Sequence, residues 1–172
     1  MSKKPADPAN GGAPTARQVP MRDFSRSLPM SLLRAREAVM RQFRPNLREH
    51  GLTEQQWRIL RALASIEAAE VTELARTAFL LGPSLSRILR DLEARNLIER
   101  KTAKADQRRS MVSISKEGVK LMASVAPNSE AIYAEITRRF GARKLAELQE
   151  MLGELEQSLA ELGAGEEASA EE

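Results

Sequence analysis

The chain has 172 residues, a formal net charge of +3 and a sequence pI of about 9.5. It contains no cysteine and one histidine, which excludes disulfides, thiolate metal ligands and cysteine redox sensing and leaves little material for a zinc site or an imidazole base. No apolar run approaches the roughly 18 residues of a membrane span, and the N-terminus lacks a hydrophobic signal core, so we expect a cytoplasmic protein of one domain with helical extensions.

The first 27 residues are rich in proline, glycine, alanine and polar groups, without a sustained hydrophobic period. This composition is typical of a disordered or loosely docked arm. From Pro29 to about Glu49 the apolar residues recur with a helical period. We expect this helix to be kinked or broken by Pro45, which lacks a backbone donor, and to end at Gly51.

A second helix is predicted to begin after Thr53, because Thr53 and Gln56 form a capping-box pattern. Apolar residues cover about half of its circumference, so we expect it to be deeply packed. Trp57 is most simply a core residue, and the wall of a ligand pocket is the alternative. A third, shorter helix is predicted around residues 71–78, followed by a turn that contains Gly82.

The next helix, in the run GPSLSRILRDLEARN, has two distinct faces at about 100° per residue. Its apolar face comprises Leu85, Ile88, Leu89 and Leu92. Its opposite face carries Ser86, Arg87 and Arg90. Two helices joined by a tight glycine-containing turn form a helix-turn-helix unit. Hydroxyls and arginines in the N-terminal half of an exposed helix can donate hydrogen bonds to base edges in a major groove, so this face predicts a DNA recognition helix. A solvated polar face is the alternative.

After that helix the hydrophobic period changes to two. Val112 and Ile114 alternate with polar residues, which predicts a half-buried strand, with residues 98–102 as its antiparallel partner. The intervening segment, with Lys104 and the run DQRR (106–109), is predicted to form an exposed hairpin tip. Such a tip can place arginine on phosphates or in the minor groove, where the potential is most negative. Helix and hairpin together predict a winged helix-turn-helix that binds duplex DNA. Basic residues in the N-terminal arm offer further DNA contacts, although a solubilising tail is the simpler interpretation.

A long helical region follows from residue 116, with a bend predicted at Pro127 and a turn at Gly141. Leucines then recur at alternating spacings of three and four, which makes nearly three heptads. They are Leu145, Leu148, Leu152, Leu155, Leu159 and Leu162. We predict that this stripe is buried against a second subunit, and folding back onto the chain's own domain is the alternative. The acidic residues 163–172 are predicted to form a frayed tail.

The order of these elements, with the runs LSRILRDLEARNLIER, DQRR and SKEG, resembles the MarR family of transcriptional regulators over residues 28–162. The runs LLRARE, LTEQQWRILR and GPSLSRILRDLE resemble, more narrowly, the branch that represses aromatic-acid catabolic operons, the homoprotocatechuate-degradation regulators in particular. The resemblance implies a mainly α fold with a small β-hairpin wing. Residues 28–51 and 116–162 would be dimerisation helices, and residues 52–115 the DNA-binding lobe. The two recognition helices of a homodimer would enter successive major grooves of a near-palindromic operator.

The resemblance and the predicted hairpin assign DNA contacts to the recognition helix and the wing. The residues concerned are Ser84, Ser86, Arg87, Arg90, Lys104, Asp106, Arg108 and Arg109. Asp106 and Arg108 match the family's Asp-x-Arg wing signature, in which the arginine enters the minor groove and the aspartate holds it in orientation. Arg109 then becomes a phosphate contact.

A small phenolic or aromatic carboxylate is the effector that the resemblance implies. Its site needs a cation, an apolar wall and a polar group. The candidates on the first two helices are Ser31, Arg34, Arg36, His50, Trp57 and Arg58. Of these we expect Arg36 or Arg58 to pair with the carboxylate and Trp57 to line the ring. Surface or intersubunit ion pairs are the alternative for the arginines.

Several functions are disfavoured by what the sequence lacks. Without cysteine the chain cannot be a thiol-based peroxide sensor, and its single histidine makes it a poor candidate for zinc-dependent regulation, so we expect no metal and no cofactor. It has no glycine-rich phosphate loop and no nucleophile–base set, so we expect no enzyme. A winged helix that serves protein assembly, or that binds DNA non-specifically without ligand control, is the alternative function.

Overall fold

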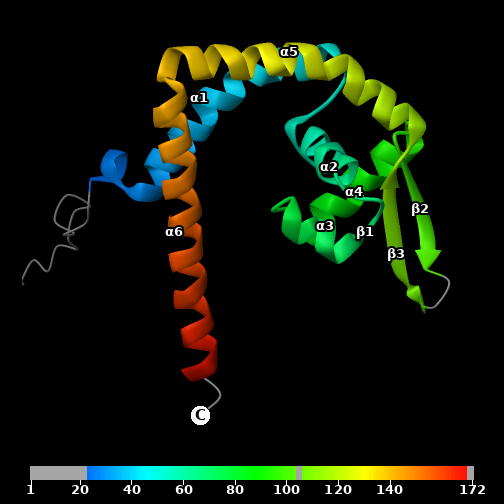
Figure 1. The fold of residues 1–172 in the computed structure, drawn as a ribbon. Coiled ribbons are helices and arrows are strands. Elements are labelled where there is room, and N and C mark those ends of the chain that lie inside the picture. Colours follow the sequence, from blue (N-terminus) through cyan, green and yellow to red (C-terminus); the bar gives the residue numbers. More distant parts are fainter. Residues whose placement is uncertain (1–22, 104–105, 170–172) are drawn as a thin grey trace, which may run out of the picture. The chain divides into compact units, whose positions relative to one another are not determined.

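In the computed structural model, the described parts of the chain are residues 23–103 and 106–169, without the side chains of residues 102–109 and 161–169. The chain comprises two compact units, residues 1–39 and 40–172. Helix α1 (Leu28–Glu49) contributes its N-terminal part to the first unit and the remainder to the second. Figure 1 shows the order of the elements along the chain.

The described part of the first unit holds the 3-10 helix η2 (Phe24–Arg26) and the start of α1. The hydroxyl and the backbone N–H of Ser25 both donate to Asp23, at 2.5 and 2.7 Å, and these hydrogen bonds lower the pKa of Asp23. Arg34 donates to the carbonyl oxygen of Ser25 at 2.5 Å. Several large apolar side chains of this unit are exposed, among them Phe24 and Leu28. The unit therefore has an unburied apolar surface of its own.

The second unit contains the remaining helices and the sheet. They are α2 (Glu54–Ala64), β1 (Ala69–Glu70), α3 (Val71–Thr77), α4 (Gly82–Ala94), β2 (Ile98–Ala103), β3 (Asp106–Ile114), α5 (Lys116–Phe140) and α6 (Ala142–Ser169). Helices α2, α3 and α4 contact one another and the sheet. This arrangement of mostly helices with a small antiparallel sheet confirms the predicted fold class.

The sheet is antiparallel, with strand order β1-β3-β2. Strand β1 was not predicted, because two residues are too few to show an alternating pattern. The hairpin is also longer than predicted: β3 begins at Asp106, so the DQRR run lies in the strand and the expectation that it forms the loop was wrong. Apolar–polar alternation marks a strand only where one face is buried, and this end of the hairpin lacks such alternation. Lys104 lies outside the described residues.

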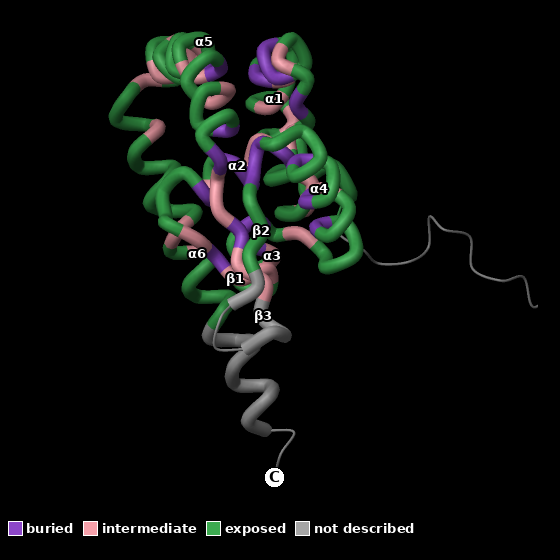
Figure 2. The backbone as a smooth tube through the Cα atoms, turned by 90° about the vertical axis from the view of Figure 1, so that its right-hand side faces the viewer, coloured by how far each residue is buried: buried purple, intermediate pink, exposed green. Residues whose placement is uncertain are grey.

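The core of the second unit is built mainly from leucines of α2, α3 and α4. Side chains with 0–1% exposure include Leu60 and Leu63 on α2, Leu74 on α3, and Leu85 and Leu89 on α4. In Figure 2 these helices carry buried positions, whereas the described part of α6 is exposed over most of its length. The helix-turn-helix is therefore held by a continuous apolar layer.

The capping box at the start of α2 is confirmed. The hydroxyl of Thr53 accepts the backbone N–H of Gln56 at 3.2 Å, and the Gln56 side chain accepts the backbone N–H of Thr53 at 2.8 Å. Gly51, with φ of +65°, ends α1 as predicted, and the N–H of Leu52 reaches back to the carbonyl of Leu47 at 2.8 Å. The link between α1 and α2 is thus tightly hydrogen-bonded.

Neither internal proline breaks its helix. Helix α1 continues through Pro45, so the predicted break does not occur, and α5 continues through Pro127. Pro45 removes only the one backbone hydrogen bond that its own position would donate to the carbonyl of Arg41, and the helix continues past it. The adjacent Asn46 is buried and donates to the carbonyl of Val125 at 3.2 Å and to the hydroxyl of Ser129 at 3.3 Å. These contacts hold the end of α1 against α5.

Helix α5 ends at Gly141, whose φ of +98° gives the predicted turn into α6. Helix α6 then extends to Ser169, beyond the predicted start of the tail at residue 163. None of the helices in the described ranges contains an apolar stretch long enough to cross a membrane.

Candidate nucleic-acid interface

Helix α4 presents a polar face above its buried leucines. Leu85, Leu89 and Leu92 are fully buried, so one side of the helix faces the core and the other side is left at the surface. Four polar side chains on its remaining surface are exposed: Ser84, Ser86, Arg87 and Arg90. Pro83 lies in the first turn, where its missing N–H costs no helical hydrogen bond. The structure thus places the four polar residues that the sequence predicted on one accessible helix.

The arginines in and after α4 divide into two groups by their neighbours. Arg95 lies 3.8 Å from the carboxylate of Asp91, and Arg100, on β2, lies 3.7 Å from that of Glu93. Within the described residues, no acidic side chain pairs with Arg87 or Arg90; the Nε of Arg90 only approaches the Ser86 carbonyl of its own helix, at 3.4 Å. Arg87 and Arg90 therefore keep their charge available to an external anion.

The predicted wing residues are placed only by their backbone. Asp106, Arg108 and Arg109 lie in β3, and their side chains are outside the described residues. The register pairs Arg100 with Val112 and Lys101 with Met111. The hairpin that carries the three residues is therefore continuous with the sheet that contacts α4.

The junction between α4, the sheet and α5 is organised by Ser115. Its hydroxyl donates to the carbonyl of Asn96 at 2.6 Å and accepts the N–H of Gly118 at 2.9 Å, which caps α5. Its backbone N–H donates to the carbonyl of Leu97 at 3.1 Å. Asn96 itself has φ of +57°, a conformation that asparagine tolerates better than most residues. The end of α4 is thereby fixed to the start of α5.

Three of the predicted ligand residues, Ser31, Arg34 and Arg36, lie on the part of α1 that belongs to the first unit. Arg34 donates to the Ser25 carbonyl, and Arg36 forms an ion pair with Glu37 at 2.7 Å. Both arginines therefore have contacts within their own unit.

The other three predicted ligand residues lie in the second unit. The Nδ1 atom of His50 lies 2.8 Å from the Asn46 carbonyl oxygen. Arg58 donates to the carbonyl of Ala78 at 2.8 Å and so ties α2 to the end of α3. Trp57 is half-buried against the core, which fits the simpler of its two interpretations and leaves part of the ring accessible.

Arg61 is a candidate that the sequence reasoning missed. Its guanidinium carbon lies 6.0 Å from the centroid of the Trp57 ring, and the residue is exposed. The signal was present in the spacing, because residues four apart on a helix are neighbours. A cation beside an accessible aromatic face supplies two of the three groups that an aromatic carboxylate needs.

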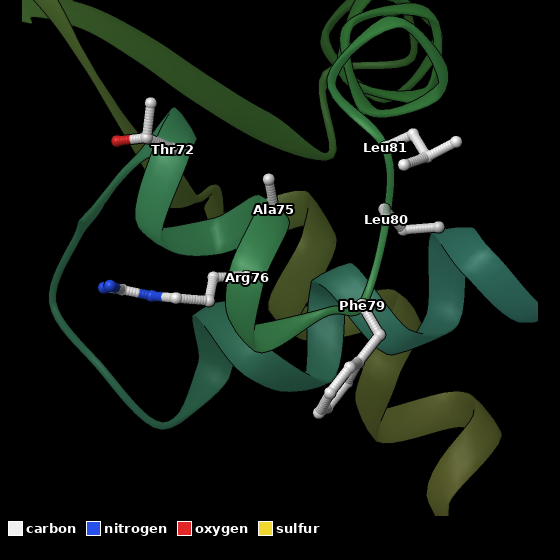
Figure 3. A pocket seen from close by; sticks show the side chains of 6 residues that line it. All are labelled: Thr72, Ala75, Arg76, Phe79, Leu80 and Leu81. Carbon is white, nitrogen blue, oxygen red and sulfur yellow. The ribbon is translucent and has the colours of Figure 1, made fainter. Parts of the chain in front are cut away.

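An exposed apolar surface lies beside the start of α4. A shallow groove of about 540 Å³ is lined by Thr72, Ala75, Arg76, Phe79, Leu80 and Leu81. Phe79 and Leu81 are 79% and 80% exposed, and Figure 3 shows their side chains extending from the turn between α3 and α4. Phe79 has φ of +51°, which is unusual for an aromatic residue.

The leucine stripe of α6 is largely uncovered. Leu145 and Leu155 are half-buried, and Leu148, Leu152 and Leu159 are exposed. Met151 adds to the same apolar surface with 56% exposure. Across the described part of the chain, no group of three acidic or histidine side chains could hold a metal ion.

A helix-turn-helix followed by a β-hairpin, with exposed arginines on its second helix, defines a winged helix-turn-helix DNA-binding protein. The sequence profile of the MarR family matches residues 50–109. The homoprotocatechuate degradative operon repressor of Escherichia coli is 41% identical over 128 residues, which are 74% of this chain and 86% of that protein. The HTH-type transcriptional regulator FarR of Neisseria gonorrhoeae is 37% identical over 80% of this chain and 94% of its own. The chain therefore belongs to the MarR family of transcriptional regulators.

Solved structures agree with this assignment. The transcriptional regulator PA4135 is 44% identical, with a TM-score of 0.74 over 76% of this chain and 96% of that one. NadR in complex with 4-hydroxyphenylacetate is 38% identical, with a TM-score of 0.69 over 79% and 96% of the two chains. The repressor CouR, bound to a 23-mer DNA duplex, is 25% identical, with a TM-score of 0.71 over 76% and 93%. MarR family regulators are non-enzymatic DNA-binding proteins, so family membership confirms that the chain is no enzyme.

Proposed function

We propose that the chain is a homodimeric repressor of an aromatic-acid catabolic operon, released from a pseudo-palindromic operator by a small aromatic carboxylate. The observation that carries the proposal is the charge division on α4, where Arg87 and Arg90 are exposed and unpaired within the described residues. The identity to a homoprotocatechuate degradative operon repressor and the likeness to NadR with bound 4-hydroxyphenylacetate support the choice of operon and effector.

Operator binding is tested by selecting bound fragments from genomic DNA and measuring their affinity by fluorescence anisotropy over a range of salt concentrations. Arg90→Ala should weaken binding by about 1–3 kcal/mol at one base pair if Arg90 contacts a base, whereas a lost phosphate contact would weaken all sequences alike. Arg143→Ala, which removes a charge from α6, is the matched control. A protein that binds no DNA would instead favour a protein-assembly module, and a protein that binds all sequences alike would favour a non-specific DNA binder.

The wing is tested separately. We propose that Arg108 enters the minor groove, oriented by Asp106, and that Arg109 and Lys104 contact phosphates. Arg108→Ala should then weaken binding to all DNA sequences, and the affinity should fall less steeply as the salt concentration rises. Unchanged affinity at moderate salt would remove Arg108 from the interface.

The dimer is supported by the uncovered apolar stripe of α6 and by the exposed apolar side chains of the first unit. Exposed apolar side chains that recur along one helix are typical of an interaction site. Leu152→Glu combined with Leu159→Glu should give monomers in analytical ultracentrifugation, together with a loss of operator affinity. Gln157→Glu places a charge beside the stripe and should leave the dimer intact. A double variant that remains dimeric would place the interface elsewhere.

For the effector we propose a site on α2 in which Trp57 lines the aromatic ring and Arg61, rather than Arg58, pairs with the carboxylate. Arg58 is engaged with the buried Ala78, whereas Arg61 is exposed beside the indole. Because Trp57 is the only tryptophan, its fluorescence reports on this site directly. Titration with 4-hydroxyphenylacetate should give a saturable change that Arg61→Gln abolishes and Arg48→Gln preserves. If no phenolic or benzoic acid changed the Trp57 fluorescence, the chain would be a DNA-binding regulator that aromatic acids do not control.

A further inference from the structure

The amide of Gln56 is fixed at both ends. Its Oε1 atom accepts the N–H of Thr53 at 2.8 Å within the capping box, and its Nε2 atom donates to the Asp91 carboxylate at 2.5 Å. Gln56 itself is 8% exposed, whereas the Asp91 side chain that accepts its hydrogen bond is 53% exposed. Because the capping box holds the carbonyl end, the donor end points at one place on α4. Gln56 thus joins the start of α2 to the C-terminal half of the recognition helix.

A second contact joins the end of α4 to Gly51, in the segment between α1 and α2. Arg95, one turn after Asp91, donates to the carbonyl of Gly51 at 2.9 Å and lies 3.8 Å from the Asp91 carboxylate. Gly51 is the positive-φ residue between α1 and α2. Asp91 near the end of α4 and Arg95 directly after it are therefore hydrogen-bonded to Gln56 and Gly51, which lie on either side of Thr53.

These polar contacts constrain α4 in a way that its apolar contacts do not. Hydrophobic burial of Leu89 and Leu92 is non-directional, so it holds the helix at the core while allowing small rotations about the helix axis. A hydrogen bond requires a particular direction, so the bond from Gln56 fixes that rotation. Asp91 directly follows Arg90, and a rotation at Asp91 moves the guanidinium of Arg90 with it. The bond therefore controls where the exposed arginines point.

We propose that Asp91 is a positioning residue, which takes the hydrogen bond of Gln56 and thereby sets the orientation of the recognition helix for operator binding. The inference rests on the proposed operator-binding function and deepens it. Gln56 directly precedes Trp57, so a ligand that displaces α2 at Trp57 and Arg61 also displaces the donor on which α4 depends. Occupation of the effector site then reaches Arg87 and Arg90 through Gln56 and Asp91.

The test uses substitutions that alter this bond and little else. Glutamate is a regular capping-box residue, so Gln56→Glu keeps the acceptor for Thr53 and places a carboxylate opposite Asp91 in place of the donor. Gln55→Glu adds the same charge to the exposed neighbouring residue and is the matched control. Adding Asp91→Asn to Gln56→Glu reverses donor and acceptor, which restores a hydrogen bond at the original net charge.

The measured quantity is the operator affinity of the full-length protein divided by its affinity for a scrambled duplex of the same composition. We expect Gln56→Glu to lower this ratio about tenfold, as for the loss of one hydrogen bond to a charged group. Gln55→Glu should leave the ratio unchanged, and the double variant should restore it. Measured on folded protein below the melting temperature, the ratio does not respond to a purely structural loss of stability. An unchanged ratio in Gln56→Glu, or no recovery in the double variant, would overturn the proposal.

The effector response gives a second readout. In Gln56→Glu, 4-hydroxyphenylacetate should still change the Trp57 fluorescence, but its effect on operator affinity should be reduced, and the double variant should recover it. An undiminished effect would overturn the coupling through Asp91. If the wild-type protein prefers its operator but binds no aromatic acid, only the effector part of the proposed function fails, and the affinity ratio still decides the role of Asp91. A wild-type protein without operator preference would refute both.

Discussion

Gly118 lies so close to Leu97 and Ile114, at one end of the β2–β3 hairpin, that the structure leaves no room for a side chain. A Cβ atom added there would stand 2.2 Å from the carbonyl oxygen of Leu97 and 2.8 Å from Cγ1 of Ile114. The Leu97 carbonyl is backbone and accepts the N–H of Ser115 at 3.1 Å, so it cannot move without disturbing the α4–α5 junction. Gly118→Ala must therefore push the first turn of α5 away from Leu97.

Two effects of opposite sign decide the outcome of Gly118→Ala. Alanine favours a helix over glycine by about 1 kcal/mol. Overpacking costs about 1–3 kcal/mol, and a shift of α5 also weakens the 2.9 Å bond from the Gly118 N–H to the Ser115 hydroxyl, a helix cap worth about 1 kcal/mol. The steric overlap and the weakened cap exceed the helical gain. We expect the free energy of unfolding to fall by about 1–3 kcal/mol.

The measurement is urea denaturation monitored by circular dichroism, at one protein concentration so that any association between copies of the chain affects both variants alike. Gly153→Ala is the matched control, since a Cβ on Gly153 of α6 meets no described atom within 4 Å apart from the adjoining residues and the backbone of its own helix. It should raise the free energy of unfolding by up to about 1 kcal/mol through helix propensity. If Gly118→Ala stabilised the protein as Gly153→Ala does, the close approach of α5 to Leu97 would be refuted.

Two further predictions concern stability. Arg58→Ala should lower the free energy of unfolding by about 1–3 kcal/mol, because the buried carbonyl of Ala78 loses its donor. Replacement of the exposed Arg61 by alanine should change the free energy of unfolding by less than about 0.5 kcal/mol. Equal losses for the two variants in urea denaturation would contradict this role of Arg58. Hydrogen bonds from Arg138 and Arg139 lower the pKa of Glu135 from 4.5 to about 2, so the small stabilisation from these surface ion pairs is present above pH 4.5 and is lost as the pH falls toward 2. Glu135→Gln should therefore differ from the wild type in stability at neutral pH and match it near pH 2, and an NMR titration of the Glu135 carboxyl with a midpoint near 4.5 would disprove the shift.

Local chemistry made part of the structure predictable. The start of α2 followed from Thr53 and Gln56, because a capping box needs only residues three apart. The two faces of α4 followed from the helical period, which placed Leu85 and Leu89 inside and Arg87 outside. In both cases the determining interactions lie within one helix.

Contacts between distant residues were not predictable in the same way. Arg58 was a candidate ligand residue, but the structure pairs it with Ala78, 20 positions along the chain. Gln56 was identified as a capping residue, and its other bond, to Asp91, spans 35 positions. Strand β1 exists only because β3 offers it a partner at Val112. Such interactions depend on the fold, which no local sequence pattern encodes.

The placement of charge along α4 explains which of its side chains would face DNA. Asp91 and Glu93 lie in the C-terminal half, beside Arg95 and Arg100, so the net positive charge is concentrated at Arg87 and Arg90. An anionic duplex is therefore attracted to Arg87 and Arg90, while Asp91 and Arg95 hold the end of the helix to Gln56 and Gly51. Binding DNA and anchoring the helix thus use different side chains.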